Sequence, residues 1–179
     1  AEIINNTKLN GHVVLNADDA FFKLHKKIAL KNKLNVISFS IKNLKSNFKL
    51  INIKRLGKVY KINIRVNTKK KFFLISNNFQ NNIYNILAAI AVMSIYENVF
   101  NLNKNIFLDF KTPGGRGDFT KIKINKKFIN LIDESYNSNP LSLKSAILNY
   151  DKIDTNKSKK YFLLGDMLEL GKHSKKLHR

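Results

Sequence analysis

The sequence of 179 residues contains no cysteine, only two prolines and only 12 acidic residues. Without cysteine it can form no disulfide framework, thiolate metal site or cysteine nucleophile. No apolar run reaches the roughly 18 residues of a membrane-spanning helix, and no signal-peptide pattern opens the chain. We therefore expect a soluble, cytoplasmic protein with no membrane partner. The histidines lack metal-ligand spacing such as H-x-x-x-H, so no metal site is predicted from them: His12, His25, His173 and His178.

The scarcity of acid leaves 33 Lys and Arg almost unopposed, with a formal net charge of +21. Such a charge usually suggests nucleic acid or an anionic surface as partner. The excess is mostly Lys, however, and it accompanies abundant Asn, Ile and Phe, which AT-rich codons favour. The basic residues are also spread over separate turns and helix faces: Lys26, Lys27, Lys31, Lys33, Lys69, Lys70, Lys71, Lys126, Lys127, Lys159 and Lys160. We predict no nucleic-acid partner, and a basic nucleic-acid-binding module stays the alternative from another class.

The first part of the chain alternates between strand and helix patterns. Residues 12–16 read as a short buried strand, and a helix over about 20–31 follows, which Asp18 or Asp19 can cap. Period-two alternation predicts antiparallel strands with one exposed face, joined in part by a hairpin turn at Gly57-Lys58. The expected β-rich runs are 34–40, 48–54, 59–66 and 72–76. Residues 82–98 then show a helical apolar stripe.

The densest cluster of chain breakers is T-P-G-G-R-G at 112–117, which we interpret as a hinge between domains. Beyond it we expect a hairpin of 120–125 and 128–132 around Lys126-Lys127, and a helix over 140–150 with proline in its first turn. A polar linker, a buried strand at 161–165 and a helix from Lys172 complete the pattern. The fold class is therefore predicted to be α/β.

One turn gathers more chemistry than any other. The apolar strand at 128–132 runs into D-E-S-Y-N-S-N-P at 133–140, which places two carboxylates, a phenol and two amides together, as a polar ligand would require. The turn resembles the D-D-S-Y-N-A-N-P signature of the Mur ligases that join D-alanyl-D-alanine to the UDP-N-acetylmuramoyl-tripeptide. Three more segments resemble family motifs in the expected order: V-L-N-A-D-D at 14–19, N-I-Y-N-I-L-A-A at 82–89 and L-G-D-M-L-E-L-G at 164–171.

The resemblance implies a fold and an activity. Residues 1–112 would be the C-terminal half of a Mur-ligase central ATPase domain, and 113–179 the start of a Rossmann-like C-terminal domain. The family uses ATP and Mg²⁺ to phosphorylate the peptide carboxylate, and the amine of D-alanyl-D-alanine then attacks the acyl phosphate, in peptidoglycan biosynthesis. Its phosphate loop, magnesium ligands and carbamylated lysine would lie upstream of 14–19. The chain thus looks like an internal fragment, inactive alone, of a monomeric ligase.

The resemblance also implies nucleotide contacts on both sides of the expected hinge. Asn85 would contact adenine, because a carboxamide offers a donor and an acceptor; a helix-start asparagine that satisfies backbone groups is the alternative. Arg116 would be the catalytic residue that reaches the phosphates, with a surface loop arginine as the alternative. Glu134 stands where the family usually has an aspartate that accepts from the ribose hydroxyls.

The remaining assignments come from the same turn and from the last motif. Tyr136, Asn137 and Asn139 match positions that line the nucleotide cleft, although N-P at 139–140 fits plain turn chemistry equally well. Asp166 and Glu169 follow an expected strand end, where ligands generally sit in α/β domains, or cap the next helix.

Some residues depart from the family pattern, and related families compete with it. Phe79 replaces a usual glycine and Asn81 a usual histidine. Another Mur ligase or a folylpolyglutamate synthase relative is the nearest alternative. Those relatives carry different residues at the turn, so Y-N-S-N-P at 136–140 favours the D-alanyl-D-alanine-adding ligases.

Overall fold

The computed structural model describes residues 2–76, 82–110, 114–153 and 159–178. They form two compact units, which we call the N-terminal unit (Ala1–Phe110) and the C-terminal unit (Lys111–Arg179). Both contain helices and strands, so the predicted α/β class is confirmed. Phe79, Asn81 and the predicted domain boundary at 112/113 lie outside the described residues.

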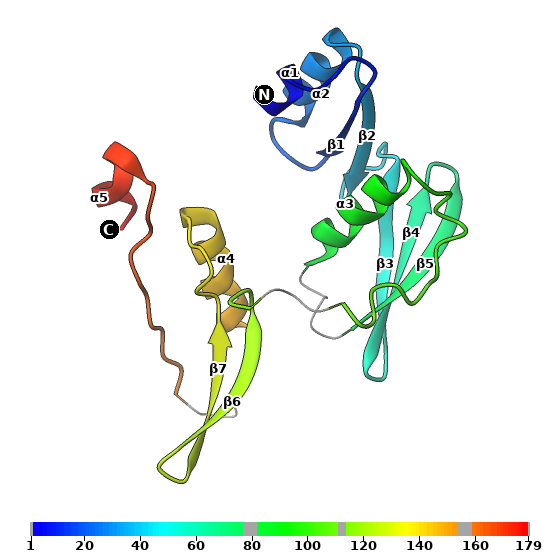
Figure 1. Ribbon diagram of the computed structural model, residues 1–179. Helices are drawn as coiled ribbons and strands as arrows, with labels where there is room; N and C mark the ends of the chain where they lie inside the picture. Colours follow the sequence, from blue (N-terminus) through cyan, green and yellow to red (C-terminus); the bar gives the residue numbers. More distant parts are fainter. Residues whose placement is uncertain (1, 77–81, 111–113, 154–158, 179) are drawn as a thin grey trace. The chain divides into compact units, whose positions relative to one another are not determined.

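The N-terminal unit is built on one five-stranded sheet in the order β1-β2-β3-β4-β5 (Figure 1). Its strands are β1 (His12–Asn16), β2 (Asn35–Ser40), β3 (Phe48–Leu56), β4 (Val59–Val66) and β5 (Lys69–Ser76). β3, β4 and β5 pair antiparallel, as the period-two pattern predicts. The same expectation is wrong for β2, which pairs parallel with both β1 and β3. The hairpin turn between Leu56 and Val59 contains Gly57 at φ 62°, a left-handed conformation that glycine adopts at no steric cost.

Helix α3 (Ile83–Met93) covers part of this sheet and closes the main core. It contacts β1, β2 and β3, and its buried residues include Leu87 and Ile90, which meet fully buried Phe73 and Ile75 of β5 in one cluster. The helix is shorter than predicted. The N–H groups of Ile95 and Tyr96 bond to carbonyls three residues back, so the chain leaves the α-helical path after Met93.

Two further helices, α1 (Glu2–Asn5) and α2 (Phe22–Lys31), pack beside β1 and β2 over a smaller core of Ile4, Val13, Ala29 and Leu34. The capping expected of Asp18 or Asp19 is not formed at the N-cap itself. The N-cap residue is Phe21, which makes no side-chain capping bond, and α2 begins two residues later than predicted. Asp19 instead accepts from the Phe21 N–H at 2.7 Å. The Asp18 carboxylate accepts from backbone N–H groups of the loop after β2.

The C-terminal unit contains a hairpin and a helix. β6 (Asp118–Ile124) pairs antiparallel with β7 (Lys127–Asp133), and α4 (Pro140–Asp151) begins with the predicted proline. The hairpin turn is Asn125-Lys126, one residue earlier than predicted, with φ values of 45° and 65°. Two left-handed residues are what a two-residue hairpin turn requires, and asparagine tolerates that conformation well.

The strand predicted at 161–165 is wrong. These residues form no strand, and Tyr161 is 76% exposed. A strand needs a neighbour for its N–H and C=O groups, and the sheet of this unit contains β6 and β7 alone among the described residues. The helix expected from Lys172 is a single 3₁₀ turn (Gly171–His173) followed by the four-residue α5 (Ser174–Leu177).

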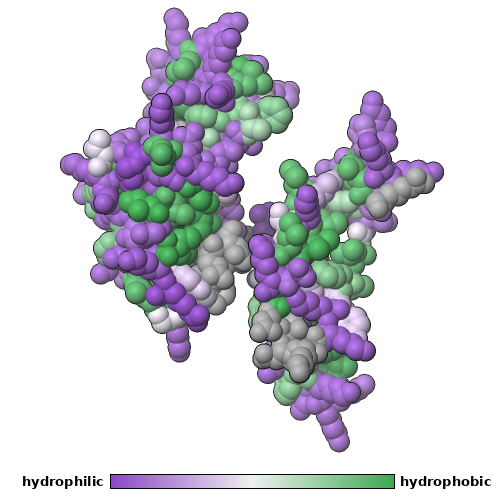
Figure 2. Space-filling model, turned by 180° about the vertical axis from the view of Figure 1, so that it is seen from behind, coloured by the Kyte–Doolittle hydropathy of each residue, from purple (hydrophilic) through white to green (hydrophobic). Residues whose placement is uncertain are grey.

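The C-terminal unit leaves apolar faces open. Among its described residues Met167 is the one buried apolar side chain. Figure 2 shows patches of apolar residues (green) on its surface between polar ones (purple). Exposed apolar residues of this unit include Phe119, Phe128, Leu141 and Leu163. In the described part of the chain, no helix is long and apolar enough to cross a membrane.

Candidate functional site

Two loops of the C-terminal unit are joined by backbone hydrogen bonds at the open end of the β6–β7 hairpin. The Gly117 N–H donates to the Asp133 carbonyl at 2.8 Å, and the Tyr136 N–H donates to the Gly115 carbonyl at 3.1 Å. The Gly115 N–H also donates to the Asp118 carboxylate at 2.7 Å. We call residues 114–118 and 133–136 the paired loops. They bring the breaker cluster and the polar turn of the sequence into one surface.

Glycine allows this close approach of the two loops. Gly115 is buried with φ 74°, and a Cβ there would lie 2.9 Å from the Tyr136 backbone nitrogen. Gly117 has φ 87°, and a Cβ there would lie 3.3 Å from a Glu134 carboxylate oxygen. L-residues rarely adopt such φ angles, so both positions favour glycine for its conformation, and Gly115 requires it for space as well.

Arg116 projects from between these glycines. Its guanidinium carbon lies 4.4 Å from the centroid of the Tyr136 ring, a cation–π distance. Within the described residues no hydrogen bond or ion pair holds the guanidinium, and both side chains are exposed. The cation–π contact uses none of the guanidinium N–H groups, so Arg116 can receive an anion with bidentate geometry.

Three carboxylates accompany this arginine in the paired loops. The Ser135 hydroxyl and N–H stabilise the Asp133 carboxylate, and they lower its pKa. Partial burial, together with the charges of Asp118 and Asp133, raises the pKa of Glu134. A hydroxyl or cationic donor near Glu134 would relieve that repulsion. Among the described residues no three His, Cys, Asp or Glu side chains are grouped to hold a metal ion.

The two predicted asparagines of the polar turn have different surroundings. Asn139 is the N-cap of α4: its side-chain oxygen accepts from the N–H groups of Leu141 and Ser142, both at 3.0 Å. The Ser142 hydroxyl accepts from the Asn139 N–H in return, which completes a capping box. Asn137 is exposed, and its side chain makes no hydrogen bond within the described ranges. The turn chemistry expected of Asn139 is therefore present.

Asn85 lies in the other unit, in the first turn of α3. Its side-chain nitrogen approaches the Asn82 side-chain oxygen at 3.5 Å, the limit of a hydrogen bond, and the residue is exposed. Within the described part of the chain it satisfies no backbone group, unlike the helix-start asparagine of the alternative. The carboxamide is therefore available to a ligand.

Asp18 has a role that the sequence interpretation missed. At the end of β1, its carboxylate accepts from the backbone N–H groups of Ile41, Lys42 and Asn43 at 2.6, 2.9 and 2.7 Å. It also accepts from the Tyr84 hydroxyl at 3.1 Å. Asp18 thus ties together the end of β1, the loop after β2 and the first turn of α3. The sequence carried one signal of this role: Asp18 and Asp19 both precede the same helix, and a single helix start does not use both carboxylates as caps.

The environment of Asp18 favours its charged form. Burial works to raise its pKa, but the backbone N–H donors, Lys42 first, and the Tyr84 hydroxyl outweigh burial, so the pKa falls below its ordinary value of 3.8. Burial and the Asp18 carboxylate raise the pKa of Tyr84, so its hydroxyl remains a donor. The Tyr84 ring also packs edge-on against Phe39, with centroids 6.5 Å apart.

Asp18→Asn should lower the free energy of unfolding of the 179-residue chain by roughly 1.5–3 kcal/mol at pH 7, because charge-assisted bonds are lost. The depressed pKa contributes stability that is present above the unfolded-state pKa and is lost as pH falls through the folded-state pKa. The difference between wild type and variant should therefore shrink near pH 3. Urea unfolding at both pH values tests this. Asp19→Asn is the control, since exposed Asp19 accepts from a single local N–H; an equal loss in both variants would contradict the role of Asp18.

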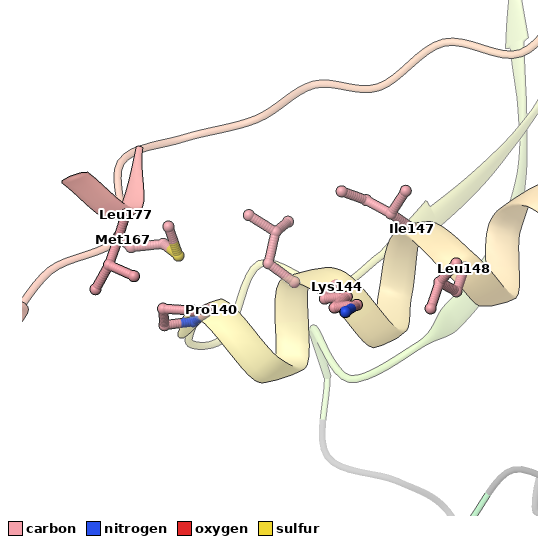
Figure 3. Close-up of a pocket in the computed structure, with 7 residues that line it drawn as sticks. Pro140, Lys144, Ile147, Leu148, Met167 and Leu177 are labelled. Carbon is pink, nitrogen blue, oxygen red and sulfur yellow. The ribbon is translucent and has the colours of Figure 1, made fainter. Parts of the chain in front are cut away.

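A separate apolar groove of about 260 Å³ lies in the C-terminal unit (Figure 3). Its lining comes from α4 and from the segments around Met167 and Leu177: Pro140, Leu143, Lys144, Ile147, Leu148, Met167 and Leu177. Lys144 supplies the only charged side chain, so the groove lacks the converging polar groups that chemistry needs. Asp166 and Glu169 make no capping bond at the helix starts that follow, and Asp166 lies 3.9 Å from the His178 ring.

The chain is similar to known ligases over its whole length. Residues 1–93 match the family model for the Mur ligase middle domain. The chain is 34% identical to the UDP-N-acetylmuramoyl-tripeptide--D-alanyl-D-alanine ligase of Buchnera aphidicola, with 100% of this chain and 38% of that protein covered. It is 28% identical to the ligase of the same name from Rickettsia prowazekii, with 99% and 38% covered. The chain thus spans about two fifths of the length of these curated relatives.

Solved structures share the fold. MurF from Acinetobacter baumannii superposes with a TM-score of 0.71 at 20% identity, covering 99% of this chain and 36% of that one. MurF from Thermotoga maritima in complex with ADP gives 0.69 at 23% identity, covering 99% and 38%. The predicted resemblance is confirmed. Since the family model covers more than half of its residues, the chain belongs to the Mur ligase family.

Proposed function

We propose that the chain is part of an ATP-dependent ligase that adds D-alanyl-D-alanine to UDP-N-acetylmuramoyl-tripeptide in peptidoglycan biosynthesis. One observation carries this choice: 34% identity, over the entire chain, to a relative of that name. The turn Y-N-S-N-P at 136–140 supports it over the sibling Mur ligases and folylpolyglutamate synthase. The ligase would act in the cytoplasm as a monomer, with residues 1–112 in its central ATPase domain and 113–179 in its C-terminal domain.

In this proposal the paired loops receive the phosphate and ribose parts of ATP. Arg116 binds phosphate, because its guanidinium is exposed and without a polar partner among the described residues. As charge moves onto the phosphoryl oxygens, a fixed cation stabilises it. Glu134 accepts from the ribose hydroxyls, which its proximity to Asp118 and Asp133 favours, since a donor relieves their repulsion.

The remaining residues complete the nucleotide contacts. Asn85 reads the adenine edge with its exposed carboxamide, whose one contact among the described residues is the 3.5 Å approach to the Asn82 side chain. Tyr136 and Asn137 belong to the nucleotide-binding turn of the C-terminal unit, and Asn139 caps α4, which fixes the direction of that turn.

Nucleotide and metal fit the described residues to different degrees. The exposed Arg116 guanidinium suits a polyphosphate, whereas no described group of acidic residues suits Mg²⁺. In this proposal the magnesium ligands and the phosphate loop belong to parts of the ligase outside this chain, as the resemblance to the family implies. Bound magnesium would supply charge neutralisation on the phosphates. The peptide carboxylate, once phosphorylated, would be attacked by the amine of D-alanyl-D-alanine, and positioning would provide much of the rate.

The assay is phosphate release by the full-length ligase that contains this chain. Release should require ATP, UDP-N-acetylmuramoyl-tripeptide and D-alanyl-D-alanine together, whereas the 179-residue polypeptide alone should release none, because it has no G-x-x-G-K-[ST] loop. Activity with UDP-N-acetylmuramoyl-dipeptide and a single amino acid instead would assign the chain to a sibling ligase. Salt-sensitive binding of arbitrary oligonucleotides, without ligase activity, would support the nucleic-acid alternative.

A further inference from the structure

The backbone around Arg116 does not by itself fix the position of the Arg116 side chain. It lies between two glycines, Gly115 and Gly117, both with positive φ, and its long side chain is exposed. Three carboxylates belong to the same paired loops, yet none comes within ion-pair distance of Arg116. Without a contact that fixes its position, the Arg116 guanidinium would form ion pairs with these carboxylates. Its N–H groups would then not be available to bind a phosphate.

The ring of Tyr136 is the one contact that holds the guanidinium within the described residues, at 4.4 Å. The backbone sets up this contact. The Tyr136 N–H bonds to the carbonyl of Gly115, the residue directly before Arg116, and Gly115 has no Cβ to keep the loops apart. The ring then holds the guanidinium by a cation–π contact, and no carboxylate among the described residues lies within ion-pair distance of its N–H groups.

We infer that Tyr136 is a positioning residue that acts through Arg116: its ring holds the guanidinium open for phosphate and away from the neighbouring carboxylates. The inference rests on the proposed function, and it gives Tyr136 a task different from direct contact with the nucleotide. The phenol oxygen makes no hydrogen bond among the described residues, so the ring alone carries the stack.

The test uses three variants of the full-length ligase. Tyr136→Leu should lower kcat about tenfold with little change in the KM for ATP, and Tyr136→Phe, which keeps the ring, should lose several-fold less kcat than Tyr136→Leu. In an Arg116→Lys background, Tyr136→Leu should have almost no further effect, because residues that act as a unit are non-additive. Tyr96→Leu is the matched control, since Tyr96 is 85% exposed and makes no ring contact in the described structure.

Each opposite result overturns the inference. Equal losses in Tyr136→Phe and Tyr136→Leu would mean that the hydroxyl binds the nucleotide directly. Additive losses in the double variant would mean that Tyr136 acts independently of Arg116. Since Tyr136 is 63% exposed, its truncation should leave the thermal unfolding midpoint near that of Tyr96→Leu; a collapse of Tyr136→Leu alone would indicate a structural role.

A second measurement separates this inference from the proposed function. In the NMR spectrum of the full-length ligase, with its arginine side chains isotopically labelled, the Arg116 side-chain protons should show an upfield ring-current shift that Tyr136→Phe retains and Tyr136→Leu removes. If wild-type ligase failed to use D-alanyl-D-alanine while this shift was present, the proposed function would be wrong and the stack would stand. If the shift were absent from wild type, the positioning role would be wrong whatever the enzyme's substrate.

Discussion

Arg116→Lys should lower the turnover number of the full-length ligase by about one to two decades while leaving its KM for ATP nearly unchanged. Lysine keeps the positive charge but loses the planar fork, so roughly 1–3 kcal/mol of charge-assisted hydrogen bonding is at stake. The effect should fall on kcat if the guanidinium meets the phosphates only as charge develops on them. The structure supports this expectation because Arg116 is exposed and has no polar partner among the described residues.

Steady-state kinetics with ATP varied measures both constants. Arg55→Lys is a suitable control, because Arg55 is also exposed and its one hydrogen bond goes to the neighbouring Gly57 carbonyl at 3.3 Å. It should leave both constants unchanged. If Arg116→Lys also kept its turnover number, Arg116 would be a surface residue of the loop. A rise in KM alone would indicate uniform binding of ATP, not stabilisation of the transition state.

The sequence predicts those elements of the fold whose signal is local. Alternation over residues 59–66 is enough for the antiparallel strand β4, and proline at 140 is enough for the start of α4. The segment at 161–165 has the same apolar composition as a strand and still forms none. Pairing depends on a neighbouring strand, and residue types within five positions carry no information about that neighbour.

The candidate site, too, has a part with a local sequence signal and a part that depends on residues distant in the sequence. The motif at 133–140 points to one of the paired loops, but the contact of Arg116 with Tyr136 joins a residue just before β6 to one just after β7, at the open end of the hairpin. The hairpin register makes that meeting predictable in retrospect, because Asp118 pairs with Asp133 and the residues just outside that pair must be neighbours. The role of Asp18 was less accessible, since its partners at 41–43 are backbone groups that any residue type supplies.

Gly115→Ala should be the most damaging single methyl addition in the paired loops. An alanine at φ 74° costs about 1–2 kcal/mol through its left-handed backbone. The added Cβ would also lie 2.9 Å from the Tyr136 backbone nitrogen, and backbone atoms cannot move aside as the end of a side chain can. Overpacking of this kind costs roughly 1–3 kcal/mol more. The loops should separate, with loss of the Gly115–Tyr136 hydrogen bond and of the Arg116 stack.

Alanine substitutions at three other glycines separate the backbone cost from the overpacking cost. Gly57 has φ 62° with nothing within 4 Å of its Cβ position, so Gly57→Ala reports the backbone cost alone. Gly117→Ala adds a 3.3 Å contact with the movable end of Glu134, and Gly114→Ala meets only an ordinary 3.7 Å contact with Asp118. Thermal unfolding of the full-length ligase should rank the loss of stability from Gly114→Ala, through Gly57→Ala and Gly117→Ala, to Gly115→Ala. Its kcat should fall most in Gly115→Ala and less in Gly117→Ala, and it should stay unchanged in Gly57→Ala and Gly114→Ala. A Gly115→Ala enzyme no worse than Gly57→Ala in both measurements would mean that the two loops do not meet through the Gly115–Tyr136 bond, because the clash at Tyr136 would then be absent.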